Sequence, residues 1–245
     1  MEDLLNRIAL LPQDWHGAGT VGRNALYAIA RHVKLIGGLR HSAETGSGKT
    51  TLLLSALSPQ HTVFALDAGD SIRRVRESEL FNAASTVFVE GPTQRTLPTH
   101  VFTKKLSLAL IDGPHGYPFP DLEYFYLYPQ IETGGLLLVD DIQIPTIRNM
   151  FNVIKADPMF ELLEIVDGNM AFFRRTSTPC IDPFSDSWWL QGYNIPHYRQ
   201  IMNLDLKPLT RRMISRLTFA GSKMFPAFIK NLVPARLKQK VFDRM

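Results

Sequence analysis

The chain has 245 residues, 45% of them hydrophobic and 20% charged, with a formal net charge of +4. This composition is that of a globular protein with a sizeable buried core, and it excludes a disordered or fibrous chain. The single cysteine, Cys180, excludes an internal disulfide and a cysteine cluster for zinc. No apolar run is long enough to span a membrane, and residues 1–11 carry two acids where a signal peptide is basic, so we expect a cytoplasmic protein.

The charge is distributed unevenly along the chain. Residues 207–245 hold ten Lys or Arg and one acid, a net charge of +9, which leaves −5 for residues 1–206. Apolar residues are interspersed in this basic tail, which predicts a helical appendage that packs on its own domain or on a second copy of the chain. Contact with the inner surface of an anionic membrane is a second interpretation. Nucleic acid is less favoured, because the sequence has no recognised nucleic-acid-binding motif.

In chain order, residues 2–11 and 21–36 read as two amphipathic helices, with Thr20 as the N-cap of the second. Residues 39–67 then read as strand, glycine turn, helix and strand. The first strand ends at Glu44 and the second at Asp67, 23 residues later. This is the order of the nucleotide-binding half of a doubly wound fold, in which an acid about 20 residues on holds a ribose hydroxyl.

The loop after Glu44 supports two interpretations. With alanine in place of its first glycine, it nearly matches a P-loop, in which Lys49 and Thr50 would hold phosphate and magnesium in an ATPase or kinase. With Gly46 and Gly48 as its key residues, it resembles motif I of the class I S-adenosylmethionine-dependent methyltransferases. In that family the glycines let the backbone approach the cofactor, and the acid faces its methionine amino group.

The elements after the first strand are predicted as helix 50–57, strands 62–66, 85–89, 106–111 and 136–139, helix 145–156, and strands 161–166 and 170–175. The tripeptide Asp167-Gly168-Asn169 predicts a tight hairpin between the last two strands. An antiparallel hairpin that closes a parallel sheet is typical of the same methyltransferase family, and it favours that interpretation over the P-loop.

Three carboxylates follow the fourth and fifth strands: Asp112, Asp140 and Asp141. Neighbouring parallel strands place their carboxyl ends at one edge of the sheet, and an oxygen-rich edge suits magnesium. Any one aspartate could instead cap a helix or a turn. The set resembles the metal-dependent O-methyltransferases of the catechol and macrolide-sugar types, a resemblance that also covers the Gly134-Gly135 turn before the fifth strand.

The resemblance implies roles for individual residues. Asp112, Asp140 and Asp141 would be the metal ligands, and His115, which stands where the catechol type has a lysine, would be the general base, although a turn residue is an equal alternative. The residues that would contact the cofactor are Glu44, Gly46, Gly48, Asp67, Gly91 and Thr93.

We therefore expect an α/β, Rossmann-like, mostly parallel sheet with a terminal antiparallel hairpin. Residues 1–38 would form a helical lead-in, 39–176 the cofactor-binding domain, and 177–245 a connector with the basic helical appendage. The expected activity is transfer of a methyl group from S-adenosylmethionine to a hydroxyl of a small molecule or sugar, assisted by Mg²⁺. A P-loop ATPase or kinase and a non-catalytic cofactor-binding module are the alternatives, and a homo-oligomer is compatible with the sequence.

Overall fold

The computed structural model describes residues 1–12 and 21–197. The chain divides into two compact units, Met1–Ile195 and Pro196–Met245, and the first of them contains the sheet and its helices. The basic tail and Thr20 lie outside the described residues, so the predictions about the tail are not addressed. No helix within the described residues is both long and apolar enough to cross a membrane.

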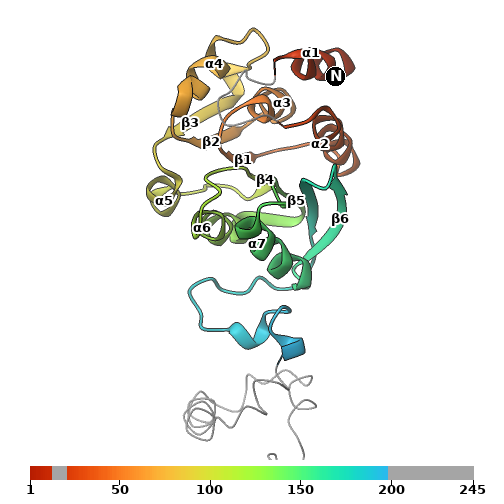
Figure 1. Cartoon of the computed structure of the whole chain (residues 1–245), viewed down its shortest axis with the longest axis vertical. Coiled ribbons are helices and arrows are strands. Elements are labelled where there is room, and N and C mark those ends of the chain that lie inside the picture. Colours follow the sequence, from red (N-terminus) through yellow and green to blue (C-terminus); the bar gives the residue numbers. More distant parts are fainter. Residues whose placement is uncertain (13–20, 198–245) are drawn as a thin grey trace, which may run out of the picture. The chain divides into compact units, whose positions relative to one another are not determined.

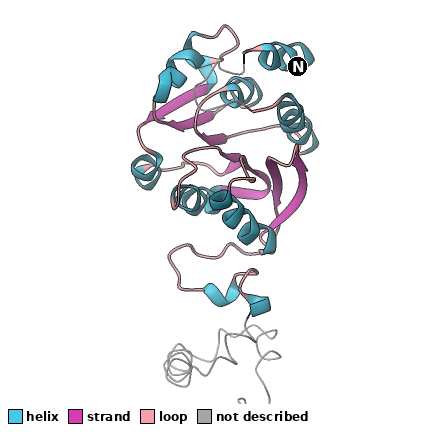
Figure 2. Cartoon of the chain, viewed as in Figure 1, coloured by secondary structure: helices cyan, strands magenta, loops and turns pink. Residues whose placement is uncertain are grey.

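The first unit is built on a seven-stranded sheet with strand order β3-β2-β1-β4-β5-β7-β6 (Figures 1 and 2). β1 to β5 are mutually parallel, and β7 is antiparallel to both β5 and β6. The strands are β1 (Ser42–Thr45), β2 (His61–Ala65), β3 (Thr86–Glu90), β4 (Leu106–Ile111), β5 (Ile131–Val139), β6 (Phe160–Val166) and β7 (Met170–Arg175). The expected parallel sheet with a closing antiparallel hairpin is thereby confirmed.

Helices cover both faces of this sheet. The α-helices are α1 (Glu2–Leu10), α2 (Arg23–Leu35), α3 (Lys49–Leu57), α4 (Ser71–Glu77), α5 (Thr93–Thr96), α6 (Phe119–Leu127) and α7 (Pro145–Ala156). Short 3-10 turns occupy Ala68–Asp70, Ala83–Ser85, Leu97–Thr99, Tyr128–Gln130, Trp188–Leu190 and Ile195–His197. Gly22, not Thr20, is the N-cap of α2, so that predicted cap is wrong.

The central strands divide the hydrophobic core into two layers because successive side chains point to opposite faces. In β4, Leu108 and Leu110 pack in the layer that contains α1, α2 and α3, whereas Ala109 and Ile111 pack in the layer that contains α7. Every residue of β4 is buried, as expected for a parallel strand covered on both faces. The amino-terminal helices therefore share one core with the sheet.

Two strands differ from the sequence prediction. β1 begins at Ser42 instead of Leu39, because pairing with β2 and β4 starts there, although Leu39 is buried nearby. Gly134 and Gly135 lie inside β5 and do not form a turn before it. Gly134 has φ 84°, and the β4–β5 register shifts between Leu106 and Leu108, so the glycines allow an irregularity within a longer strand.

Candidate active site at the carboxyl edge of the sheet

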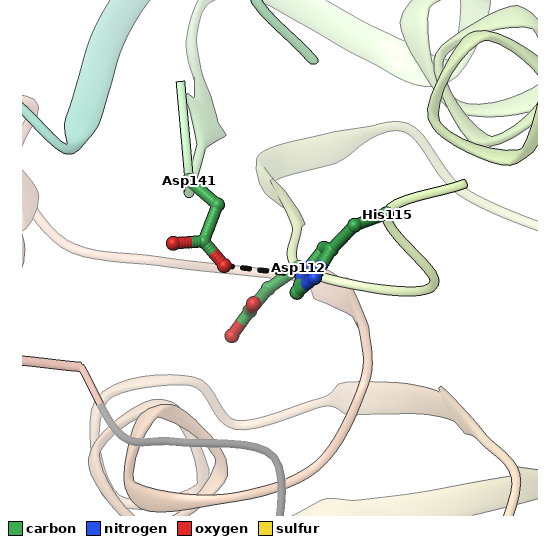
Figure 3. A group of neighbouring side chains, drawn as sticks. All are labelled: Asp112, His115 and Asp141. Carbon is green, nitrogen blue, oxygen red and sulfur yellow. Dashed lines mark ion pairs between the residues drawn. The ribbon is translucent and has the colours of Figure 1, made fainter. Parts of the chain in front are cut away.

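The carboxyl ends of β4 and β5 bring together Asp112, His115 and Asp141 (Figure 3). One donor atom from each side chain lies within 4.8 Å of the others, and all three side chains are partly buried. The Nε2 atom of His115 is 3.1 Å from Oδ2 of Asp141. Residues from two separate loops thus converge on one small volume at the edge where doubly wound sheets bind ligands.

Asp141 reaches this group through an unusual backbone conformation. Its φ is 55°, in the left-handed region that aspartate tolerates better than most residues. Its Oδ1 accepts a hydrogen bond from Gln143 Nε2 at 2.8 Å, which leaves Oδ2 to face His115. Such left-handed residues cluster at ligand-binding sites, where the surrounding structure holds them in place.

The side chain of Asp140, the preceding residue, points towards the β6–β7 turn. Its Oδ1 accepts a hydrogen bond of 2.9 Å from Asn169 Nδ2, and Asn169 belongs to the β6–β7 turn. Burial raises the pKa of Asp140 to about 7, and the charge of Asp141 adds to the effect. Asp140 is therefore at the predicted edge but outside the group of three, while its role as a metal ligand stays a prediction.

The electrostatics of this edge favour a cation. Burial raises the pKa of Asp112 well above its ordinary value, and the neighbouring carboxylates of Asp140 and Asp141 raise it further. The two carboxylates offer the oxygen donors that magnesium and manganese prefer, whereas an imidazole is a donor better suited to zinc or iron. The donor set thus fits a divalent ion, which would relieve the repulsion between the acids.

The glycine loop lies directly against Asp112. Gly46 has φ 83°, and a Cβ atom at this position would overlap the carbonyl oxygen of Asp112. Its N–H donates to the carbonyl oxygen of Phe64 in β2 at 2.9 Å. Only glycine fits here without strain, so the loop after β1 is fixed between the ends of β2 and β4.

Lys49, the first residue of α3, does not face a phosphate site. It is 5% exposed, and its Nζ donates a 2.7 Å hydrogen bond to the carbonyl oxygen of Leu11, just after α1. Burial lowers its pKa. The lysine therefore joins α3 to the amino-terminal helix, and this use contradicts the P-loop interpretation of Lys49 and Thr50.

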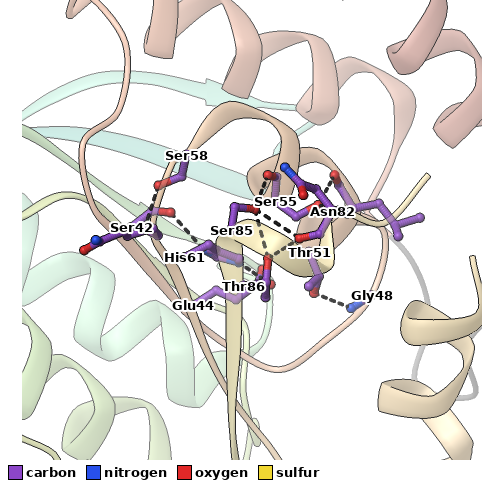
Figure 4. Close-up of polar contacts among 12 residues, drawn as sticks. Ser42, Glu44, Gly48, Thr51, Ser55, Ser58, His61, Asn82, Ser85 and Thr86 are labelled. Atoms are coloured by element: carbon purple, nitrogen blue, oxygen red, sulfur yellow. Dashed lines mark hydrogen bonds and ion pairs between the residues drawn. The ribbon is translucent and has the colours of Figure 1, made fainter. Parts of the chain in front are cut away.

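Glu44 is the most deeply buried of the predicted cofactor residues (Figure 4). Its Oε1 lies 3.1 Å from Nε2 of His61, and Nδ1 of His61 lies 2.8 Å from Oγ of Ser42. Among the described residues, Oε2 of Glu44 has no hydrogen-bond partner. The structure thus gives Glu44 a buried partner that the sequence did not reveal.

The other predicted cofactor residues lie at the ends of β2 and β3. Asp67 is exposed just after β2, and its Oδ1 accepts a 2.8 Å hydrogen bond from the N–H of Ile72 at the start of α4. Gly91, with φ 139°, donates its N–H to the carbonyl oxygen of Ala65 at 2.9 Å. Thr93 is buried, and its hydroxyl lies close enough to the Glu123 carboxyl group to lower the pKa of that acid. These residues follow β2 and β3, and Glu44 lies near the carboxyl end of the adjacent β1.

Comparison with known proteins identifies the domain that carries this site. The family model for a methyltransferase domain matches residues 43–142, from β1 to the residue after Asp141. The chain contains a class I S-adenosylmethionine-dependent methyltransferase domain. The matched segment includes the glycine loop and the group of three, and the enzyme's parallel sheet with its closing antiparallel hairpin agrees with the prediction.

Solved structures share the fold of this methyltransferase at low sequence identity. A protein from Klebsiella pneumoniae, described provisionally as an O-methyltransferase, aligns with a TM-score of 0.57 at 16% identity over 71% of this chain and 90% of its own. The O-methyltransferase TomG from Streptomyces achromogenes, in complex with S-adenosylmethionine, gives 0.54 at 13% identity over 72% and 91%.

A third structure, an O-methyltransferase from Bacillus cereus in complex with S-adenosylhomocysteine, gives a TM-score of 0.51 at 16% identity over 71% of this chain and 90% of its own. No curated protein matches the sequence. At these identities the likeness establishes the fold, and the methyl acceptor has to be argued from the site.

The sequence did not reveal several residues that support the site. Asn169, Gln143 and Thr146 hold Asp140, Asp141 and the backbone of His115, respectively. They lie in turns or at a helix start, where a polar residue is the ordinary expectation. Glu123 near the same loop is different. It is a buried acid within the aromatic segment Leu122–Leu127 of α6, and an acid in such an apolar helix is a signal that the sequence does show.

Proposed function

We propose that this enzyme transfers a methyl group from S-adenosylmethionine to a hydroxyl of a small molecule or sugar, with the assistance of a divalent metal ion. The observation that carries the proposal is the convergence of Asp112, His115 and Asp141 at the carboxyl ends of β4 and β5. Methyl transfer to oxygen needs a deprotonated hydroxyl held in line with the methyl group. An acid-rich edge beside a base can supply both requirements.

For the cofactor, the proposed contacts are Glu44, Gly46, Gly48, Asp67, Gly91 and Thr93. The backbone of the glycine loop would lie against the cofactor. Gly46 allows the loop to pack on the carbonyl oxygen of Asp112, which holds the loop at the carboxyl edge of the sheet. Asp67 has one oxygen committed to α4, and its other oxygen would meet the ribose hydroxyls. Glu44 would face the amino group through Oε2, since Oε1 is engaged by His61.

For the metal, the proposed ligands are Asp112, Asp140 and Asp141. Asp112 and Asp141 already face one another, whereas Asp140 would exchange its hydrogen bond with Asn169 for the ion. When bound, a divalent ion lowers the pKa of a hydroxyl and stabilises the alkoxide.

His115 is the proposed general base. Oδ2 of Asp141 lies 3.1 Å from Nε2. A carboxylate at this distance would favour a proton on Nε2, which would leave Nδ1 free to take a proton. His115 would take the hydroxyl proton at Nδ1. S-adenosylmethionine, when bound, would supply the methyl group and leave as S-adenosylhomocysteine. Proton transfer to a positioned base of this kind contributes about 10²- to 10⁴-fold in rate.

Metal dependence and the acceptor class can be tested together. The full chain is incubated with radiolabelled S-adenosylmethionine and pools of phenols, sugars and other hydroxyl compounds, in EDTA and after addition of excess Mg²⁺. We expect labelled product in at least one hydroxyl pool, lost in EDTA and restored by Mg²⁺. Transfer that is equally fast in EDTA would reject the metal, and transfer only to amines or thiols would reject the hydroxyl acceptor.

A further inference from the structure

Thr45, the last residue of β1, connects the candidate metal site to a buried acid on α6. Its Oγ1 accepts a 3.0 Å hydrogen bond from the N–H of Asp112 and donates a 2.7 Å hydrogen bond to Oε2 of Glu123. The exposed fractions of Thr45 and Glu123 are 0% and 1%. Three segments that are far apart in the sequence thus meet in one chain of hydrogen bonds.

The direction of this chain is fixed by the chemistry of its members. A threonine hydroxyl has one proton to give and two lone pairs with which to accept. Because the N–H of Asp112 can only donate, the hydroxyl proton of Thr45 must point to another acceptor, and Glu123 is the acceptor present. Glu123 therefore determines which way the hydroxyl points, and the hydroxyl determines where the backbone of Asp112 is held.

The second oxygen of Glu123 lies against the next residue of the same loop. A Cβ atom at Gly113 would overlap the Glu123 carboxyl group, so glycine is the residue that fits. Burial raises the pKa of Glu123 to about 7, partly opposed by hydrogen bonding from the hydroxyls of Thr45 and Thr93 and from the N–H of Gly113. Burying a carboxyl group carries a desolvation cost, which core packing alone does not explain.

The other end of the loop is held as well. Thr146, in the first turn of α7, donates from Oγ1 to the carbonyl oxygen of His115 at 2.6 Å. Residues 112–115 are thus fixed at their first N–H and at their last carbonyl oxygen. Asp112 and His115, both in the group of three, are the ends of this short segment.

We propose that Thr45 and Glu123 are positioning residues, which fix the backbone of residues 112–115 so that Asp112 and His115 face Asp141. This inference rests on the proposed metal-assisted function, because a geometry this specific matters only if the three side chains share a ligand. Neither residue touches the substrate. Their contribution is to hold the loop in the arrangement that binding requires before any ligand arrives.

The test uses a matched pair of substitutions at Thr45. Thr45→Val keeps the shape and removes the hydroxyl, whereas Thr45→Ser keeps the hydroxyl. Mn²⁺ affinity is measured by titration calorimetry on the full chain. Outer-sphere hydrogen bonds of this kind change metal affinity by about 10- to 100-fold, so we expect a loss of that size for Thr45→Val and near wild-type affinity for Thr45→Ser. Glu123→Gln, which keeps the shape of the side chain, should give an intermediate loss.

A second readout does not depend on the metal. Hydrogen exchange at the Asp112 amide should be about 5- to 13-fold faster in Thr45→Val and restored in Thr45→Ser, because one hydrogen bond of about 1–1.5 kcal/mol protects it. Thr62→Val, on β2, is the control and should change neither measurement. For the acceptor, kcat should fall in Thr45→Val with KM little changed.

The outcomes separate this inference from the function on which it rests. A folded Thr45→Val protein with wild-type exchange at Asp112 rejects the positioning role. Equal Mn²⁺ affinity in Thr45→Val and wild type also rejects it. If wild-type protein binds no Mn²⁺, the proposed metal site is rejected, and the exchange measurement still decides whether Thr45 holds the loop.

Discussion

This enzyme has two histidine–carboxylate pairs, one fully buried and one partly exposed. Comparing them distinguishes a pair that stabilises the fold from a pair that can take part in the reaction. His61 Nε2 lies 3.1 Å from Glu44, and His115 Nε2 lies 3.1 Å from Asp141. The side chains of the first pair are 0% exposed, whereas those of the second are 35% and 23% exposed. The contact distance is the same, so distance alone does not identify the functional pair.

The partners of each imidazole distinguish the two pairs. Both nitrogens of His61 are engaged, by Ser42 and by Glu44, beneath α3 (Figure 4). His115 has a carboxylate on one side, and no hydrogen bond to its Nδ1 is found within the described residues (Figure 3). A fully engaged imidazole can only support the fold, while one with a free nitrogen at an acid-rich edge can move a proton.

The largest expected effect is on activity, at the exposed pair. His115→Ala should lower methyl transfer by about 10²- to 10⁴-fold, since the base is removed, and should change the free energy of unfolding by less than about 0.5 kcal/mol. Initial rates with radiolabelled cofactor and urea unfolding provide the two numbers. His41→Ala, at the opposite edge of the sheet, is the matched control. A rate within threefold, that is about 0.7 kcal/mol, of wild type would exclude His115 as the base.

The next effect is on stability, at the buried pair. His61→Ala should lower the free energy of unfolding by about 2–4 kcal/mol, because it opens a cavity and leaves Glu44 and Ser42 without their shared partner. Urea unfolding followed by circular dichroism measures this change. Because Glu44 is also a proposed cofactor contact, KM for S-adenosylmethionine should rise, while kcat per folded molecule at low temperature should be kept. An unchanged free energy of unfolding would show that the buried pair does not stabilise the fold.

The third effect is the pH dependence of stability of the metal-free enzyme. The pKa of Asp140 rises on folding from its ordinary value of 3.8 to about 7, mainly through burial. Between these values the folded state binds more protons than the unfolded state, so the free energy of unfolding should fall as pH rises towards 7 and then level off.

This fall should be smaller in Asp112→Asn, since burial and the nearby carboxylates Asp140 and Asp141 raise the pKa of Asp112 as well. Unfolding in EDTA at pH 5 and pH 8 provides the comparison, with Asp3→Asn on exposed α1 as the control. A free energy of unfolding that is higher at pH 8 than at pH 5 would contradict the electrostatic description of this edge.

Much of the fold could be predicted because its signals are local. The apolar run of β4, the proline that starts α7 and the Asp167-Gly168 turn gave correct bounds for these elements, and both turn residues have the positive φ that such a turn needs. The start of β1 was not predictable in this way. It depends on pairing with β2 and β4, whereas the apolar residues before Ser42 are buried without being in a strand.

The sequence predicted where the site lies, but it did not predict the orientations of its side chains. Parallel strands place Asp112 and Asp141 at one edge, and that much follows from topology. Consecutive residues of a strand point in opposite directions, so Asp140 and Asp141 could not both be oriented without knowing that Asp141 adopts a left-handed backbone. The sequence also left the role of Lys49 open between phosphate binding and packing. Its hydrogen bond to the Leu11 carbonyl oxygen depends on how α1 packs against α3, which the sequence does not show.

Direct measurement of metal binding tests the central claim, that the carboxylates after β4 and β5 form a cation site. Electron paramagnetic resonance can follow the loss of free Mn²⁺ as it is titrated into the wild-type protein and into Asp112→Asn. We expect saturable binding of a single ion by the wild type, competed by Mg²⁺, and loss of this binding in the variant. Binding that is absent from the wild type, or equal in both proteins, would contradict the proposed site.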